Sequence, residues 1–373
     1  MSSVELIAVP GLPEVLPGDD LAALVRQALR GEDGRTGLRD GDLLAISSKV
    51  VAKAEGRFVA GGDEAALEAA VDSQTVRVVA ERLTPRGRAR IVRSASGPVL
   101  AAAGVDASNV PDGADGRARV LLLPADPDAS ARRLRAALRN ATGLRLGVLV
   151  TDTLGRPWRI GQTDTAIGAA GVVVADDLTG RPDALGRLME VTVRALADEI
   201  AAAADLVKNK TDGVPLALVR GLAHLVTDGD GPGAAALLRG EGEDWFRFGH
   251  AEAARTALGL LPEDDAVPVQ PVGAGEISEQ LDRARAVALA TSGPGELPAD
   301  LVVEREAGPA LVLRSGTESP AAWLAIGALA QRIAVAAWAE GLDVTAAVTE
   351  GRPGRSPAVT IAPRGGPRGG LRP

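Results

Sequence analysis

Aromatic side chains are almost absent from this chain. They make up 2% of its 373 residues, whereas hydrophobic residues make up 46%. A folded core must therefore consist of Ala, Val and Leu, which fill space through many small contacts. The length exceeds that of a usual single domain, so we expect one large domain and a smaller one.

Composition excludes several classes of protein. The net charge of -8, with no long basic run, argues against a nucleic-acid surface. The absence of cysteine excludes disulfides and thiolate metal sites. No basic segment followed by an apolar signal-peptide core opens the chain, and the richest apolar run, 321–342, is broken by Gln331 and Arg332. We interpret that run as a buried helix and expect a cytoplasmic protein that contacts neither membrane nor nucleic acid.

Two residue types are scarce enough to guide a search for chemistry. The only histidines are His224 and His250, so catalysis must depend on carboxylates, amides, Lys, Arg or a bound metal. Only four lysines occur among 41 basic residues, in two close pairs at 49, 53, 208 and 210. A lysine in an arginine-rich chain can mark a place that needs a compact ammonium, although chance is an equal explanation.

Helical and strand patterns alternate without a strict repeat, which indicates an α+β fold or a complex α/β one. The patterns predict helices over 20–29, 64–82, 129–139 and 186–207. They predict strands over 43–46, 99–109, 120–123 and 146–150.

A domain boundary is expected near 241–249, where Trp245, Phe246 and Phe248 would close the first domain. The predicted domains are residues 1–249 and 250–373. Residues 262–275 are expected to be a linker, and the Gly/Pro/Arg tail from 363 to 373 is expected to be disordered.

Three acidic residues, Glu14, Asp106 and Asp152, stand in predicted loops or at strand ends. Carboxylates next to hydroxyls and amides provide the oxygen ligands that Mg²⁺ or Mn²⁺ prefers, usually completed by substrate phosphates. Most aspartates in loops only cap helices or close turns, so the spacing of these carboxylates alone is weak evidence for a metal site.

Two polar segments follow predicted strands. Residues 151–159 combine a carboxylate, hydroxyls, two arginines and Trp158, which favours a functional loop over a cation–π turn. Residues 47–53 place Lys49 and Lys53 four apart behind two serines, where they could bind phosphate or form a solvated helix face. No Walker or dinucleotide motif occurs, so any nucleotide site is of a less common type.

Together these segments resemble the coenzyme F420-0 γ-glutamyl ligase family, whose enzymes attach glutamates to the lactyl-phospho end of a deazaflavin. The resemblance covers roughly residues 4–250. It is carried by the motifs at 11–20, 48–57, 103–110, 151–158, 161–168, 197–199 and 213–221.

The resemblance implies an α+β ligase that forms homodimers and uses GTP, coenzyme F420-0 and L-glutamate as substrates. It implies two divalent ions, Mg²⁺ or Mn²⁺, with K⁺ as a further candidate. By motif matching, the GTP site would be lined by Leu12, Pro13, Glu14, Val15, Ser48, Lys53 and Asn109. The metal ligands would be Asp106, Asp152 and Thr153, and the catalytic residues would be Lys53 and Asp152.

The implied reaction is transfer of the γ-phosphate of GTP to the precursor's carboxylate, followed by attack of the glutamate amine on the acyl phosphate. One position departs from the family, which often has asparagine where this chain has Ile160. In actinobacterial relatives a flavin-binding nitroreductase-like domain follows the ligase. Residues 250–373 are shorter and lack the basic segment that binds flavin phosphate, so we expect a degenerate region without FMN.

Two other functions remain open from the sequence. An FMN- or deazaflavin-dependent oxidoreductase would purify yellow with stoichiometric FMN. A non-catalytic binding protein for coenzyme F420 would add no glutamate to the precursor when GTP and a metal are supplied.

Overall fold

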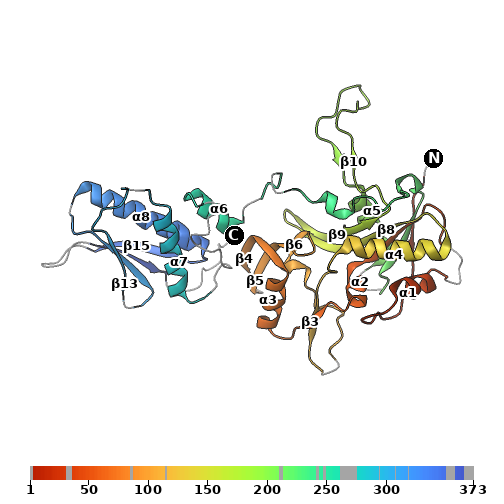
Figure 1. The fold of residues 1–373 in the computed structure, drawn as a ribbon, viewed down its shortest axis with the longest axis horizontal. Coiled ribbons are helices and arrows are strands. Elements are labelled where there is room, and N and C mark those ends of the chain that lie inside the picture. Colours follow the sequence, from red (N-terminus) through yellow and green to blue (C-terminus); the bar gives the residue numbers. More distant parts are fainter. Residues whose placement is uncertain are drawn as a thin grey trace. The chain divides into compact units, whose positions relative to one another are not determined.

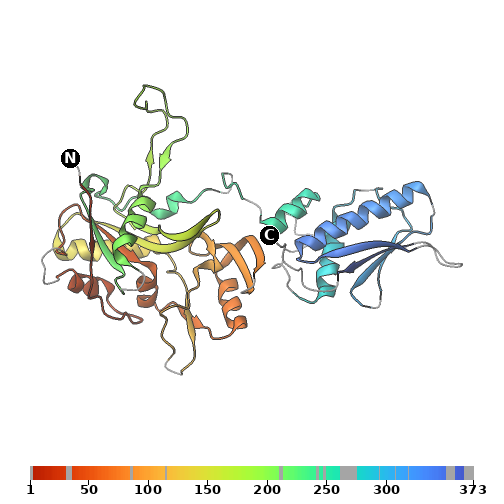
Figure 2. The same cartoon turned by 180° about the vertical axis from the view of Figure 1, so that it is seen from behind.

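The computed structural model describes residues 3–30, 36–84, 87–113, 116–209, 213–240, 243–246, 249–260, 275–293, 295–306, 308–317, 319–349 and 358–364. The chain forms two compact units, each built from two chain segments (Figures 1 and 2). The first comprises Met1–Arg77 and Ile91–Asp244, and the second comprises Val78–Arg90 and Trp245–Pro373.

A five-stranded sheet forms the centre of the first unit. Its order is β1-β12-β2-β8-β9, and only β2 and β8 run parallel. The strands are β1 (Glu5–Ala8), β12 (Leu216–Arg220), β2 (Leu43–Ser47), β8 (Gly147–Arg156) and β9 (Arg159–Ala170). Parallel strands end at the same edge of a sheet, so the residues after β2 and the end of β8 meet there. This mixture of strands and helices agrees with the expected α+β class.

Helices cover both faces of this sheet. Alternate strand residues point to opposite faces, so Val148 and Val150 pack on the side of α4 (Pro127–Thr142), and Leu149 packs on the side of α5 (Leu196–Lys208). Every buried hydrophobic residue in the described ranges is Ala, Val, Leu or Ile. The predicted small-residue core is therefore confirmed.

Shorter elements complete the first unit. They are α1 (Leu21–Ala28), α2 (Ser48–Ala54), β3 (Phe58–Ala60), α3 (Glu64–Ser73), β4 (Thr75–Thr84), β5 (Gly87–Ser94), β6 (Val99–Ala101), η1 (Ala102–Gly104), β7 (Arg119–Leu121), β10 (Asp176–Asp177), β11 (Val193–Arg194), η2 (Ala223–Leu225) and η3 (Ala234–Leu237). Of these, β4 and β5 lie partly in the second unit. β3 pairs with β7, and β4, β5 and β6 form a separate three-stranded sheet. The β10–β11 arm projects away from the main sheet (Figure 1).

Three element predictions were wrong in part. The helix predicted over 64–82 ends at Ser73, and β4 follows, because its Val-rich sequence suits a pleated strand better. The helix predicted from 186 begins only at Leu196, and the residues before it lie in the exposed arm. The strand predicted over 99–109 stops at Ala101, where positive φ angles of Ala102 and Ala103 end the extended chain.

The second unit is a four-stranded antiparallel sheet with helices packed on it. Its elements are α6 (His250–Ala257), α7 (Ile277–Ala290), α8 (Pro320–Ala339), β13 (Val302–Glu306), β14 (Ala310–Arg314), β15 (Val344–Thr349) and β16 (Ala358–Pro363), in the strand order β13-β14-β16-β15. Ile326, Leu329 and Ile333 of α8 lie in its core. Buried Glu340 accepts hydrogen bonds from Arg255 and Arg283.

The long apolar run does form the predicted helix, α8, although only one face of it is buried. Among the described residues, α8 is the one helix long and apolar enough to cross a membrane by length and composition, a test that core helices also pass.

Three predictions for the boundary regions have different outcomes. Trp245 and Phe246 are exposed and belong to the second unit, so they do not close the first. Pro363 ends strand β16 and was wrongly placed in the tail. The predicted linker, apart from Gly275, and the tail from 365 onward lie outside the described residues.

Candidate functional site

The predicted polar segment 151–153 lies in β8 just after a β-bulge. Val150 pairs with Gly168 and Thr151 with Ala166, so β9 has one extra residue at this point. A bulge increases the local twist and changes where the next side chains point. Beyond it, the Asp152 carboxylate accepts a 2.6 Å hydrogen bond from the Ser48 hydroxyl at the start of α2.

The next residue of α2 holds a second predicted carboxylate. The Lys49 ammonium lies 2.7 Å from Asp106 Oδ2 and also donates to the backbone and hydroxyl oxygens of Ser108. Asp106 Oδ1 accepts from the Ser108 N–H. Partial burial alone would raise the pKa of Asp106, but the hydrogen bonds from Lys49 and Ser108 outweigh it and hold the pKa below its ordinary value. Two consecutive helix residues thus hold Asp152 and Asp106.

Two further predicted site residues, Lys53 and Glu14, meet one turn further along α2. Buried Lys53 pairs with Glu14 across 2.5 Å, and the Glu14 side chain is 62% exposed. Leu12 and Val15 pack against the hydrophobic core on either side of this carboxylate, while Pro13 is exposed. The core therefore anchors the loop and presents Glu14 outward.

Asn109 follows the Asp106 loop with a φ of 53°. Asparagine is one of the few non-glycine residues that tolerates this left-handed conformation. The structure places it in that loop, close in sequence to Ser108, which contacts Lys49.

Thr153 lies on the other face of the strand. Its hydroxyl donates to Asp164 Oδ1 across 2.6 Å, and the Thr151 hydroxyl donates to Asp164 Oδ2 across 2.9 Å. Lys208 Nζ lies 2.5 Å from the same Oδ2. The structure therefore separates the side chain of Thr153 from those of Asp152 and Ser48.

The chemistry of these residues fits a hard divalent cation. Asp106 and Asp152 offer carboxylate oxygens, which Mg²⁺ and Mn²⁺ accept, whereas the hydroxyl of the predicted ligand Thr153 faces Asp164 instead. Within the described ranges, no three His, Asp or Glu side chains group closely enough to form a metal cage by themselves. Mg²⁺ commonly uses one or two carboxylates together with substrate phosphates, so a cage is not required.

The tip of the β8–β9 hairpin carries the remaining predicted residues. Trp158 is 78% exposed and Ile160 is fully exposed. Arg156 donates to the carbonyl oxygens of Ile160 and Gly161. Position 160 therefore contacts Arg156 through its backbone carbonyl rather than through its side chain.

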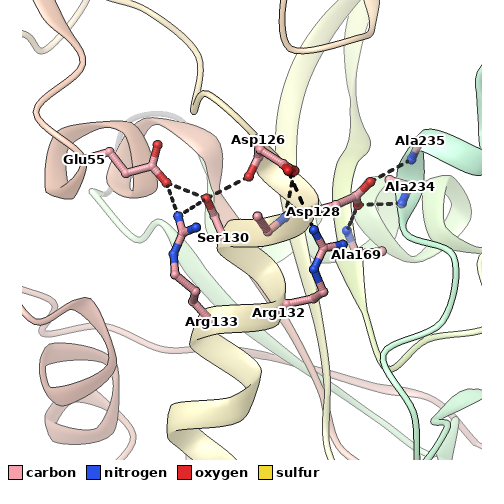
Figure 3. A network of polar contacts seen from close by, with 10 residues as sticks. Glu55, Asp126, Asp128, Ser130, Arg132, Arg133, Ala169, Ala234 and Ala235 are labelled. Atoms are coloured by element: carbon pink, nitrogen blue, oxygen red, sulfur yellow. Dashed lines mark hydrogen bonds and ion pairs between the residues drawn. The ribbon is translucent and has the colours of Figure 1, made fainter.

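Sequence reasoning missed a polar network around the start of α4 (Figure 3). Buried Asp128 accepts hydrogen bonds from the N–H groups of Ala169, Ala234 and Ala235 and so joins α4 to β9 and η3. Glu55 at the end of α2 accepts from Ser130 and Arg133. Asp126-Pro127 before a helical pattern was the available signal, since it is a helix start.

A cavity of about 330 Å³ lies beside this network. It is lined by residues 95–98, 125–128, 166–167, 234–235 and 238, including Ser96, Asp126 and Asp128. None of the predicted site residues lines it.

Known proteins resemble about two thirds of this chain. A sequence model described as F420-0:Gamma-glutamyl ligase matches residues 11–221. The coenzyme F420:L-glutamate ligase of Methanopyrus kandleri is 38% identical over 267 residues, which are 66% of this chain and 99% of that protein. The protein of the same name from Archaeoglobus fulgidus is 39% identical over 256 residues, 65% of this chain and 96% of that protein. The resemblance found from the motifs is confirmed, and about a third of this chain lies outside it.

Proposed function

This chain belongs to the F420-0:gamma-glutamyl ligase family, and on that premise we propose that it adds L-glutamate to coenzyme F420-0 in a GTP-dependent, divalent-metal-dependent reaction. The observation that carries the proposal is the start of α2. There, Ser48 and Lys49 bring Asp152 and Asp106 together from different parts of the matched region.

In this proposal α2 forms one wall of a GTP site. Lys53 lies one helical turn beyond Lys49, so both ammonium groups face the same side and can neutralise phosphate oxygens. The loop with Glu14 and the loop with Asn109 would complete the site. GTP would then compete with Glu14 for the Lys53 ammonium.

The protein residues would act mainly by position and charge. Bound Mg²⁺ or Mn²⁺ supplies Lewis-acid charge stabilisation to the phosphoryl group. Asp106 and Asp152 would hold the cation, and Ser48 would keep Asp152 oriented. Lys53 would stabilise the negative charge that develops on the oxygens of the transferred γ-phosphoryl group. This positive charge would also reduce the repulsion between the precursor carboxylate and GTP, so that the two can approach each other. The precursor carboxylate would attack the γ-phosphorus of GTP and GDP would leave. The glutamate amine would then attack the acyl carbon, phosphate would leave, and the amine would lose a proton to give the amide.

We also propose that residues 250–373 are a degenerate nitroreductase-like region without FMN, and that the protein works as a cytoplasmic homodimer. The four-stranded sheet with the long helix α8 is compatible with this assignment. Analytical ultracentrifugation tests the homodimer, and the absorbance spectrum of the purified protein tests the absence of FMN.

Mass spectrometry of the deazaflavin tests the main proposal. The full chain is incubated with coenzyme F420-0, GTP, Mn²⁺ and glutamate, and a mass increment of one or more glutamates is expected. Reactions without GTP, with ATP in its place, or with EDTA are expected to give none. A complete reaction that leaves the mass unchanged would contradict the ligase assignment. Product formed without GTP would contradict the nucleotide requirement alone.

A further inference from the structure

A buried ion pair lies on the face of the sheet opposite Ser48. Lys208 and Asp164 are each 4% exposed, and their charged groups are 2.5 Å apart. Lys208 Nζ also donates to the Thr151 hydroxyl across 2.7 Å. The pair, Thr151 and Thr153 form a network that no step of the proposed reaction uses.

The network holds β8 on both sides of Asp152. Thr151 and Thr153 point to the face of α5, and Asp152 between them points to the face of α2. An ionised carboxylate only accepts hydrogen bonds, so both hydroxyl protons must be directed at Asp164. These hydrogen bonds on the α5 face therefore fix the backbone of β8 on both sides of Asp152.

Stability alone does not explain a buried ion pair of this kind. Taking two charges out of water costs about as much as their attraction returns, and apolar pairs of similar volume are often as stable. Lys208 ends α5, where a cation interacts favourably with the helix dipole, but an exposed lysine would do so as well. It is also one of four lysines in a chain rich in arginine.

We infer that Lys208 and Asp164 are positioning residues for the candidate metal site. They fix the strand segment that carries Asp152 and Thr153 after the β9 bulge, so that Asp152 meets Ser48 and the cation in one geometry. The inference rests on the proposed function, because it assigns a role toward the cation of that site. Groups behind a metal ligand typically alter metal affinity by about 10- to 100-fold.

The test is a set of full-length variants: Asp164→Asn, Lys208→Met and the double variant. Each single change leaves one buried charge without its partner and is expected to lower the melting temperature strongly. The double variant removes both charges, so its melting temperature is expected to return close to that of the wild type. Its affinity for Mn²⁺ with GTP present, measured by calorimetry, is expected to stay at least about tenfold weaker. Metal-free GTP affinity is expected to stay unchanged.

Two controls separate positioning from general packing. Asp42→Asn weakens the buried Asp42–Arg220 pair in the same unit and is expected to lower the melting temperature without changing Mn²⁺ affinity. If the double variant does not fold, Thr153→Val and Thr153→Ser take its place, and only the valine variant is expected to lose Mn²⁺ affinity. The inference would be overturned if the double variant folds and binds Mn²⁺ with wild-type affinity. It would also be overturned if Thr153→Val binds Mn²⁺ with wild-type affinity. Wild-type protein that forms no glutamylated product would instead contradict the proposed function.

Discussion

Lys53 is the residue on which the proposed nucleotide site depends most. Its ammonium is buried while its partner Glu14 is exposed, so the pair opens outward to an incoming anion. The other ammonium of α2, Lys49, is already joined to Asp106 and Ser108. The two lysines thus have different partners although they lie on one helix face.

Replacing Lys53 by alanine is expected to weaken GTP binding by about 10- to 100-fold, the usual effect of losing a hydrogen bond to a charged group. Calorimetric titration with GTP and Mg²⁺ measures it. Arg133→Ala serves as the matched control, since it removes a cation from the Glu55 pair outside the site and is expected to leave GTP affinity unchanged. Equal GTP affinity in wild type and Lys53→Ala would remove Lys53 from the site.

Ile160 stands where the resemblance leads us to expect asparagine. Its side chain is fully exposed, and its carbonyl oxygen already accepts from Arg156. Ile160→Asn is therefore expected to change the free energy of unfolding by no more than about 0.5 kcal/mol, as for other surface substitutions. Chemical denaturation checks this. A larger loss would mean that the isoleucine side chain makes contacts in solution that the folded monomer does not provide.

At the scale of elements, the bulge between β8 and β9 is held by a carboxylate of α5. The Asp198 side chain accepts a hydrogen bond from the Ala166 N–H across 3.0 Å. Burial raises the pKa of Asp198, and the Ala166 hydrogen bond only partly offsets that rise. At neutral pH the buried negative charge of Asp198 therefore destabilises the folded protein, whereas its hydrogen bond with Ala166 stabilises it.

Asp198→Asn keeps an acceptor and removes the charge, so we expect equal or higher stability at pH 7. A raised folded-state pKa means that wild type gains stability as pH falls through that pKa toward the ordinary value of 3.8. The advantage of the asparagine variant should shrink over the same range. Asp198→Ala leaves the buried N–H unsatisfied and is expected to lose about 1–3 kcal/mol. Denaturant titrations across pH measure both, and an asparagine variant as unstable as the alanine one would contradict this account.

The elements that sequence patterns predicted best are those in which local preference and burial agree. The helix predicted over 20–29 is found as α1 with Asp20 as its N-cap, and the strand predicted over 43–46 is found as β2. The 64–82 region failed because alanine-rich helix and valine-rich strand follow each other without a glycine or proline between them.

Contacts between distant segments could not be predicted in the same way. The sequence singled out Asp106, Asp152 and Lys49 as residues of interest, but their meeting at α2 depends on the parallel pairing of β2 with β8. Asp164 lies within the 161–168 motif. It was given no role, because a single aspartate in a strand has no local signature. Its role becomes visible only in the folded structure, where Lys208 at the end of α5 forms an ion pair with it.

At the scale of the whole molecule, the second unit includes a segment taken from the first half of the chain. Residues 78–90 belong to it together with everything after Asp244. Gly249 at the start of α6 lies so close to this segment that a Cβ would be 2.1 Å from the Val78 carbonyl oxygen. A side chain at that position requires the backbone to shift.

Gly249→Ala is therefore expected to destabilise the second unit by about 1–3 kcal/mol while leaving ligase activity unchanged. Gly327→Ala, inside α8 with open space around it, is the matched control and is expected to stabilise the same unit by about 0.5–1 kcal/mol. Differential scanning calorimetry of both variants measures the effects. A Gly249→Ala protein that melts like wild type would show that this close approach is absent in solution.

The hydrogen bond between Ser48 and Asp152 joins residues 104 positions apart in the chain. A nucleotide–cation complex bound to both segments would close the same loop a second time, as a removable crosslink between β2 and β8. Bringing the two ends of such a long loop together costs the unfolded chain a substantial amount of conformational entropy. A ligand bound to both ends would hold the loop closed in the folded protein. Substrate occupancy would thus determine how often β2 and β8 separate. The rate of amide hydrogen exchange in β2 would then report the fraction of protein molecules that have nucleotide bound at the proposed site.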